Sequence, residues 1–166
     1  MNKILIINTG GTFNKIYNPI KGELQVPVDA KVLENILCYF YGVTYEIKNI
    51  LHKDSLEMTE EDRKAIVEEI NKNNCNKILI VHGTDTIDKT AEFLDKQIKT
   101  KIIVLTGAMV PFSIDAIEAT ANFSLALTSL MLGDKNGIFI AIHGLIAPYQ
   151  KIYKNRIKGR FELKKE

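Results

Sequence analysis

The sequence predicts a three-layer α/β protein, in which a mainly parallel sheet lies between helices on both faces. Short apolar runs alternate along the 166 residues with stretches of helical periodicity, which is the pattern of successive β-α-β units. The runs are rich in Ile and Val, as is typical of strands buried on both faces. Hydrophobic residues make up 46% of the chain and charged residues 25%, which are ordinary values for a globular protein. We therefore expect residues 1–166 to form a single domain.

The individual elements can be located from apolar runs and from signals at their ends. Thr59 followed by Glu60-Glu61-Asp62 predicts a helix start, since a threonine N-cap and acidic residues in the first turn both stabilise a helix N-terminus. The segment Phe13–Val28 contains Asn, Pro and Gly and has little apolar periodicity, so we expect a loop or a loose hairpin there. The expected strands are Ile4–Ile7, Val43–Ile47, Ile78–Val81, Ile102–Leu105 and Ile138–Ile142, and the expected helices are Val32–Tyr39, Glu60–Asn71, Ile87–Lys96 and Ala116–Leu132.

Charge and cysteine content narrow the function classes. The net charge is only +2, but residues 151–166 hold seven basic and two acidic side chains, a local balance of +5. We expect a solvated basic tail or an edge strand there, with a patch for nucleic acid or another anionic partner as the alternative. Cys38 and Cys75 form neither a disulfide framework nor a metal spacing, and Cys38 is expected in the core. Apolar runs are too short for a signal sequence or a membrane span, which predicts a cytoplasmic protein.

Polar residues and glycines lie beside three of the expected strands. Thr9-Gly10-Gly11-Thr12 and Val81-His82-Gly83-Thr84-Asp85-Thr86 each follow an apolar run, and Lys101 through Met109 begins with a lysine before a strand and continues to Gly107 after it. Glycines allow tight turns and close approach of the backbone to a ligand, and open α/β sheets bind ligands at the carboxyl ends of their strands. We expect these segments to converge on one pocket, whose residue types suit amide hydrolysis.

In order and context, these segments resemble the bacterial-type L-asparaginases and their glutaminase-asparaginase relatives. Asp54 through Met58 is similar to the family's substrate-binding serine segment, and the resemblance extends from about Lys3 to the region of Gly144. One position departs from it, because Val110 stands where the family pattern has an arginine. Family members also carry a C-terminal domain that the sequence to Glu166 does not include. We therefore expect the N-terminal domain of this family, with its fold, in a short form.

The resemblance implies a set of catalytic residues. Thr12, exposed by the preceding glycine pair, is the expected nucleophile of an acyl-enzyme mechanism. Thr84 would supply a hydroxyl beside the scissile amide, with Lys101 and Asp85 holding and tuning it, because a nearby ammonium favours the deprotonated hydroxyl. The segment after Thr12 corresponds to a mobile lid that carries a tyrosine, and Tyr17 is the residue expected in that role.

Substrate-binding roles follow from the same resemblance. Asp85, together with Thr84, would contact the substrate, and the Asp85 carboxylate would pair with its α-amino group. Ser55 and the backbone N–H of Gly11 would bind the α-carboxylate, for which N–H groups are natural donors. Structural roles are the alternatives: Thr12 capping a turn, Asp85 helping to cap a helix with Thr86, Lys101 as an exposed lysine, Ser55 as a loop serine and Tyr17 as a surface tyrosine.

Neither a metal nor a nucleotide cofactor is expected. His52, His82 and His143 lie in different segments without ligand spacing, although His82 could orient the adjacent loop. No glycine follows Gly10-Gly11 at positions 13–15, so the dinucleotide-binding pattern fails, and the phosphate-binding Gly-x-x-x-x-Gly-Lys pattern is also missing from the sequence.

Two function classes remain open from the sequence. The first is an asparaginase-type amidohydrolase that converts L-asparagine, or a similar small amino-acid amide, to aspartate and ammonia. The second is a catalytically weak module that binds a small amino acid or a dicarboxylate. In either case the stretch Ala116–Leu132 is nearly apolar all round, so it is buried in the core or against a partner, and we expect a homodimer.

Overall fold

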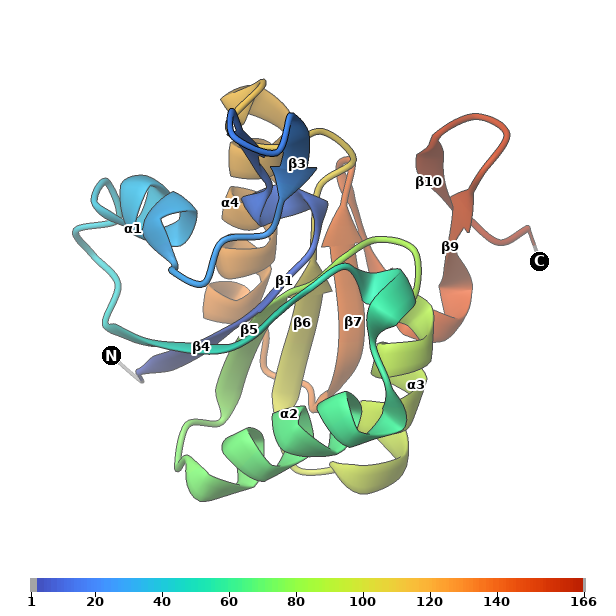
Figure 1. The fold of residues 1–166 in the computed structure, drawn as a ribbon. Coiled ribbons are helices and arrows are strands. Elements are labelled where there is room, and N and C mark those ends of the chain that lie inside the picture. Colours follow the sequence, from blue (N-terminus) through green and yellow to red (C-terminus); the bar gives the residue numbers. More distant parts are fainter. Residues whose placement is uncertain (1–2, 166) are drawn as a thin grey trace.

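The computed structural model describes residues 3–165, which form a central six-stranded sheet with helices on both faces (Figure 1). The strands lie in the order β4-β1-β5-β6-β7-β8. Neighbours are parallel from β4 to β7, and only β8 runs antiparallel to its neighbour within the sheet. This confirms the predicted three-layer α/β fold with a mainly parallel sheet. The strand bounds are Ile4–Gly10 (β1), Tyr45–Lys53 (β4), Lys77–Val81 (β5), Ile102–Thr106 (β6), Gly137–Ile142 (β7) and Leu145–Pro148 (β8).

Two helices cover each face of the sheet. Helices α1 (Lys31–Leu37) and α4 (Ala116–Leu132) pack on one face, and α2 (Glu60–Lys72) and α3 (Ile87–Gln97) pack on the other (Figure 1). In β5, Ile78 and Ile80 belong to the core on the α2–α3 side, while Leu79 and Val81 belong to the core on the α1–α4 side. Because successive strand residues point to opposite faces, a strand covered on both sides needs an uninterrupted apolar run, which is what the sequence shows.

The predicted start of α2 and the loose hairpin are confirmed. At the start of α2, the Thr59 hydroxyl accepts a hydrogen bond from the Asp62 N–H at 3.2 Å, and the Asp62 carboxylate accepts one from the Thr59 N–H at 2.8 Å. This reciprocal capping box satisfies two of the free N–H groups of the first turn. After Thr12, strands β2 (Ile16–Asn18) and β3 (Glu23–Gln25) form a short antiparallel hairpin.

The basic C-terminal segment is not a solvated tail, and its edge strands belong to a small sheet apart from the main one. It forms a separate two-stranded antiparallel sheet of β9 (Ile152–Asn155) and β10 (Arg160–Leu163) after a short turn at Tyr149–Lys151. Ile152 and Phe161 are 1% and 3% exposed and join the core beside α3. Burial of these two apolar side chains fixes the position of the hairpin against the core. The position of its basic residues is fixed as a consequence.

One further expectation about burial was wrong, and another is only partly tested. Cys38 is exposed rather than in the core, because α1 ends at Leu37 and its inward face already consists of residue pairs 32–33 and 36–37. Helix α4 buries Phe123 and Leu127 in the core, while Ile117 and Leu132 on its outward face are 77% and 81% exposed, so burial of that face against a partner stays a prediction. Among the described residues, no helix is long and apolar enough to cross a membrane.

Candidate active site

The loops after β1 and β5 touch at two glycines. Gly11 has φ +76°, which lies in the left-handed region, and a Cβ on it would lie only 2.5 Å from Gly83. A Cβ on Gly83 would in turn lie 2.6 Å from the Cβ of Ser55. Real Cβ contacts are essentially never this short, so glycine is needed for the three segments to approach each other. The approach brings together two of the segments that were expected to converge, those of Thr12 and Thr84, with the segment of Ser55.

This glycine contact brings Thr12 near Thr84. Each threonine directly follows one of the two touching glycines, so their Cα atoms lie at most about 12 Å apart, given about 3.8 Å between consecutive Cα atoms. Thr12 begins a 3-10 turn, Thr12–Asn14, and is partly buried. Within residues 3–165, its hydroxyl has no hydrogen-bond partner, whereas Asn14 in the same turn bonds both Asn8 and the Gly10 carbonyl. The side-chain oxygen of Thr12 is therefore not committed to holding the turn.

Ser55 is bound to the loop that carries Thr84 and Asp85. Its hydroxyl accepts a hydrogen bond from the Asp85 N–H at 3.2 Å, and its carbonyl accepts one from the Thr86 hydroxyl at 2.8 Å. Ser55 is 1% exposed. Thr86 therefore spends its hydroxyl on Ser55 rather than on capping α3, which has no side-chain N-cap bond.

A lysine joins Thr84 and Asp85, but it is Lys154 of β9. The Lys154 ammonium donates to the Thr84 hydroxyl at 2.8 Å and to Asp85 Oδ1 at 2.9 Å. Thr84 is 4% exposed and the Lys154 side chain 14% exposed, so water screens these contacts only weakly. The arrangement holds an ammonium against a hydroxyl and fixes that ammonium with a carboxylate, which is the chemistry expected of a lysine in this pocket.

The prediction that Lys101 lies in this site was wrong. Its ammonium donates to the carbonyls of Asn73 and Cys75 at 2.9 and 2.7 Å, at the amino ends of β5 and β6. The five residues of β6 separate it from the loops at the other edge, a distance of roughly 17 Å at about 3.3 Å per strand residue. Lys101 lies just before its strand, so a side chain there cannot reach the loop that follows the strand.

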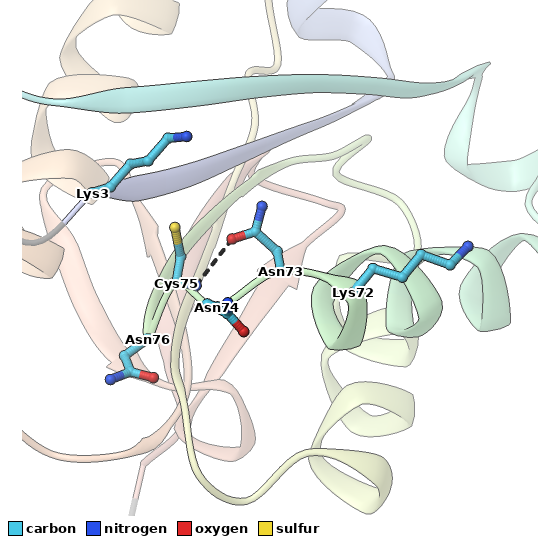
Figure 2. A pocket seen from close by; sticks show the side chains of 6 residues that line it. All are labelled: Lys3, Lys72, Asn73, Asn74, Cys75 and Asn76. Atoms are coloured by element: carbon cyan, nitrogen blue, oxygen red, sulfur yellow. Dashed lines mark hydrogen bonds between the residues drawn. The ribbon is translucent and has the colours of Figure 1, made fainter.

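The pocket at this amino edge is large but holds none of the predicted site residues. It has a volume of about 490 Å³, and Figure 2 shows Asn73, Asn74, Cys75 and Asn76 lining it between Lys3 and Lys72. The Asn73 side chain accepts the Cys75 N–H at 2.9 Å, and Lys3 is paired with Glu46. A smaller pocket of about 120 Å³ is the one lined by Thr84, Asp85 and Lys154. The smaller pocket is therefore the one that contains predicted site residues.

A second cation on Asp85 was also missed from the sequence. The Arg156 guanidinium donates to Asp85 Oδ1 at 2.5 Å and to the Asp85 carbonyl at 3.0 Å. Partial burial alone would raise the pKa of Asp85, but the hydrogen bonds from Lys154 and Arg156 outweigh it and hold that pKa below its usual value. The signal that could have found both residues is the excess of basic residues at 151–166, which by itself is equally typical of a solvated surface.

Tyr17 is not brought into contact with the other predicted site residues. It lies on β2 and is 62% exposed, and its hydroxyl makes no hydrogen bond within residues 3–165. The hairpin that carries it is tied to the rest of the protein near its base, where Lys15 pairs with Asp54 at 2.7 Å and Ser113 donates to the Lys15 carbonyl at 2.7 Å. The role of Tyr17 stays a prediction.

The buried His82 side chain contacts the backbone of the loop that carries Thr84. It is fully buried, with Nδ1 2.7 Å from the Gly83 carbonyl and Nε2 2.8 Å from the Thr90 hydroxyl. A carbonyl only accepts, so Nδ1 carries the proton and Nε2 accepts from Thr90. Burial lowers the pKa of His82 to about 4, so the ring is neutral at pH 7. A neutral His82 fixes the direction of the Gly83 carbonyl.

Comparison with known proteins identifies the family that the sequence motifs resemble. The model of the family described as asparaginase, N-terminal, matches residues 3–161. The glutaminase-asparaginase of Acinetobacter glutaminasificans is 27% identical over 92% of this chain and 50% of its own length. The L-asparaginase of Thermococcus kodakarensis is 30% identical over 84% of this chain and 43% of its own length.

Structural comparison agrees with the sequence matches. A solved structure of the thermostable L-asparaginase from Thermococcus kodakarensis superposes with a TM-score of 0.84 at 27% identity, covering 97% of this chain and 51% of that one. A further relative, one component of the glutamyl-tRNA(Gln) amidotransferase of Methanococcus vannielii, is 29% identical over 88% of this chain and 35% of its own length. The chain thus spans about half the length of the first curated relatives it matches.

Proposed function

We propose, since this chain belongs to the asparaginase N-terminal family, that it hydrolyses the side-chain amide of L-asparagine or a similar small amide to the acid and ammonia. The observation that carries the proposal is the contact of Lys154 with both Thr84 and Asp85, next to the glycine contact that brings Thr12 near. The proposed reaction needs no metal, cofactor, nucleic acid or membrane partner. We propose a cytoplasmic location for the protein as well.

In the proposed mechanism, Thr12 is the nucleophile. Its uncommitted hydroxyl oxygen attacks the amide carbon, the C–N bond breaks, and the leaving nitrogen takes up a proton to depart as ammonia. The resulting acyl ester on Thr12 is then hydrolysed by water, which restores the hydroxyl and releases the carboxylic acid. Splitting the reaction in this way replaces one difficult step with two easier ones.

Thr84 is the proposed proton donor to the leaving nitrogen, and the proton that the Thr12 hydroxyl loses on attack restores the Thr84 hydroxyl. Its oxygen accepts a hydrogen bond from the Lys154 ammonium, which favours the negative charge that forms when the hydroxyl gives up its proton. Asp85 holds the ammonium in place from the other side. Ser55 and the Gly11 N–H are proposed to receive the substrate carboxylate, and the hairpin with Tyr17 is proposed to close over the bound substrate.

Ammonia release from L-asparagine by purified protein is the direct test. Thr12→Ala should abolish turnover and leave the fold intact, since the Thr12 hydroxyl makes no hydrogen bond in the described residues. Thr44→Ala, an exposed threonine before β4 at the amino edge of the sheet, is the matched control and should retain activity. Undiminished turnover in Thr12→Ala would move the nucleophile elsewhere.

The second candidate function is a catalytically weak module that binds a small amino acid or dicarboxylate. The placement of Arg156 on Asp85 favours the dicarboxylate as the ligand of such a module, because this contact occupies the carboxylate that would otherwise receive an α-ammonium. Binding of a small acid by a protein that releases no ammonia would select this candidate.

A homodimer is proposed for either function. The outward face of α4 presents Ile117 and Leu132, with Ala121 and Thr128 exposed between them, and apolar faces of this kind usually mark interfaces. Light scattering at micromolar concentration should give twice the 18.7 kDa of the chain. Replacing Ile117 and Leu132 by Glu should return the mass to that of one chain, whereas a wild-type monomer would refute the interface.

A further inference from the structure

Arg156 lies on the carboxylate that the proposed function reserves for a substrate ammonium. Asp85 Oδ1 accepts hydrogen bonds from both Lys154 and Arg156, at 2.9 and 2.5 Å. The second nitrogen of the guanidinium bonds the Asp85 carbonyl at 3.0 Å. Arg156 therefore binds both the side chain and the backbone of Asp85, with one terminal guanidinium nitrogen on each.

The hairpin holds Arg156 in this position. Asn155 caps the turn between β9 and β10 by accepting the N–H groups of Ile157 and Lys158 at 3.2 and 3.1 Å. On β10, the Phe161 side chain is buried and its N–H donates to His143 Nδ1 at 3.2 Å. The turn that carries the guanidinium is thus held by the hydrogen bonds to Asn155 and by the buried Phe161 of β10.

An α-ammonium would meet two cations at this point. Oδ2 of Asp85 has no hydrogen bond within the described residues, but an ammonium bound there would lie roughly 5 Å from the nitrogens on Oδ1, given hydrogen bonds of about 2.8 Å. Asp88 lines the same pocket but is exposed, and Asp54 is already paired with Lys15. Neither of these two carboxylates would offset the repulsion between the substrate ammonium and the two cations on Asp85.

A carboxylate or a neutral group at the same position would not be repelled by these two cations. The guanidinium has five N–H donors and spends two on Asp85. Its side chain is 62% exposed, so the remaining donors can reach a ligand. Arginine presents its donors in a planar fork that matches the two oxygens of a carboxylate.

We propose that Arg156 is a specificity-determining residue, which makes this site prefer the monoamides of dicarboxylic acids that lack an α-ammonium, such as succinamate, over L-asparagine. The inference rests on the proposed function, because it assumes that the substrate end remote from the amide lies beside Asp85. It replaces the α-amino acid amide in that proposal with a simpler substrate class.

Binding of the two product acids tests the inference without requiring turnover. Succinate and L-aspartate differ only in the α-ammonium, and calorimetric titration gives the ratio of their affinities. The wild-type protein should bind succinate at least tenfold more tightly than L-aspartate. Arg156→Gln, which keeps a polar side chain and removes the charge, should shift this ratio at least tenfold toward L-aspartate.

Lys158→Gln is the matched control for the loss of one positive charge from the same turn. Lys158 pairs with Glu162 at 3.0 Å and not with Asp85, so this variant should keep the wild-type ratio within about twofold. A wild-type preference for L-aspartate, or a ratio that Arg156→Gln leaves unchanged, would overturn the inference. A ratio that moves equally in both variants would do the same, because the effect would then be one of net charge.

Ammonia release from succinamate and L-asparagine by the same preparations separates this inference from the proposed function. The predicted affinity ratios without ammonia from either amide would support the role of Arg156 and overturn the proposed hydrolysis. Turnover of L-asparagine with affinity ratios insensitive to Arg156 would support the hydrolysis and overturn the role of Arg156. Failure of the folded wild-type protein to bind either acid or to hydrolyse either amide would overturn both.

Discussion

Lys101 and Lys154 lie at opposite ends of the central strands and show how differently sequence position and spatial position can be related. Lys101 is adjacent in sequence to β6, yet it bonds the carbonyls of Asn73 and Cys75 at the amino edge of the sheet. Lys154 is 70 residues away from Thr84 in the sequence, yet its ammonium lies 2.8 Å from the Thr84 hydroxyl. A residue just before a parallel strand lies at the amino edge of the sheet, and the length of the strand separates it from the loop that follows.

Removing the two ammonium groups in turn should give the largest contrast between the two edges. Lys154→Met should lower kcat/KM for amide hydrolysis by about 10²- to 10⁴-fold, the usual contribution of a positioned group that assists proton transfer. Lys101→Met should leave kcat/KM within a few-fold of wild type, because its ammonium serves only the Asn73–Cys75 turn. Equal losses in the two variants would show that neither lysine acts in the chemistry.

The pH dependence of stability should distinguish the buried histidine behind the site from an exposed one. The unfolded chain binds a proton at His82 below about pH 6.5, whereas the folded protein binds it only below about 4. The unfolded state thus holds more protons between these values, so stability falls as pH decreases from 6.5 to 4 and is unaffected by this group above 6.5. The loss amounts to about 3 kcal/mol at 1.36 kcal/mol per pKa unit.

Chemical denaturation at pH 7 and pH 4.5 measures this effect. His82→Gln should lack most of the pH-dependent loss, while His52→Gln, at an exposed position of β4, should keep it. If wild type and His82→Gln lose the same free energy of unfolding over this range, the histidine is not held neutral in the folded protein.

The glycine contact at the carboxyl edge should be less tolerant of a methyl group than a glycine in open space. Gly83→Ala would place its Cβ 2.6 Å from the Cβ of Ser55, so the loops must move apart. We expect the free energy of unfolding to drop by about 1–3 kcal/mol, as for other overpacked positions. Gly42→Ala meets no atom within 4 Å and should change stability by less than about 1 kcal/mol. Equal tolerance at both positions would contradict the close contact.

Much of the fold could be predicted because local signals and burial agree. The uninterrupted run Ile78–Val81 is buried on both faces, and Thr59 is the N-cap that the sequence predicts, in a capping box with Asp62. The hairpin β9–β10 was missed, since it has one strongly buried residue on each strand and its basic side chains mask that pattern. Long-range packing, rather than local propensity, determines that it folds against α3.

The residues of the candidate site also fall into two groups, those that local sequence signals predict and those that depend on long-range packing. The sequence was sufficient to predict that glycine turns carrying Thr12 and Thr84-Asp85 follow two of the strands, because apolar runs and the glycines that end them are local features of the chain. Only the tertiary structure decided which cations meet Asp85, since Lys154 and Arg156 reach it through a hairpin that is positioned by the burial of Ile152 and Phe161. Side-chain contacts across 70 residues depend on how elements pack, and packing is set by the whole core rather than by any one segment.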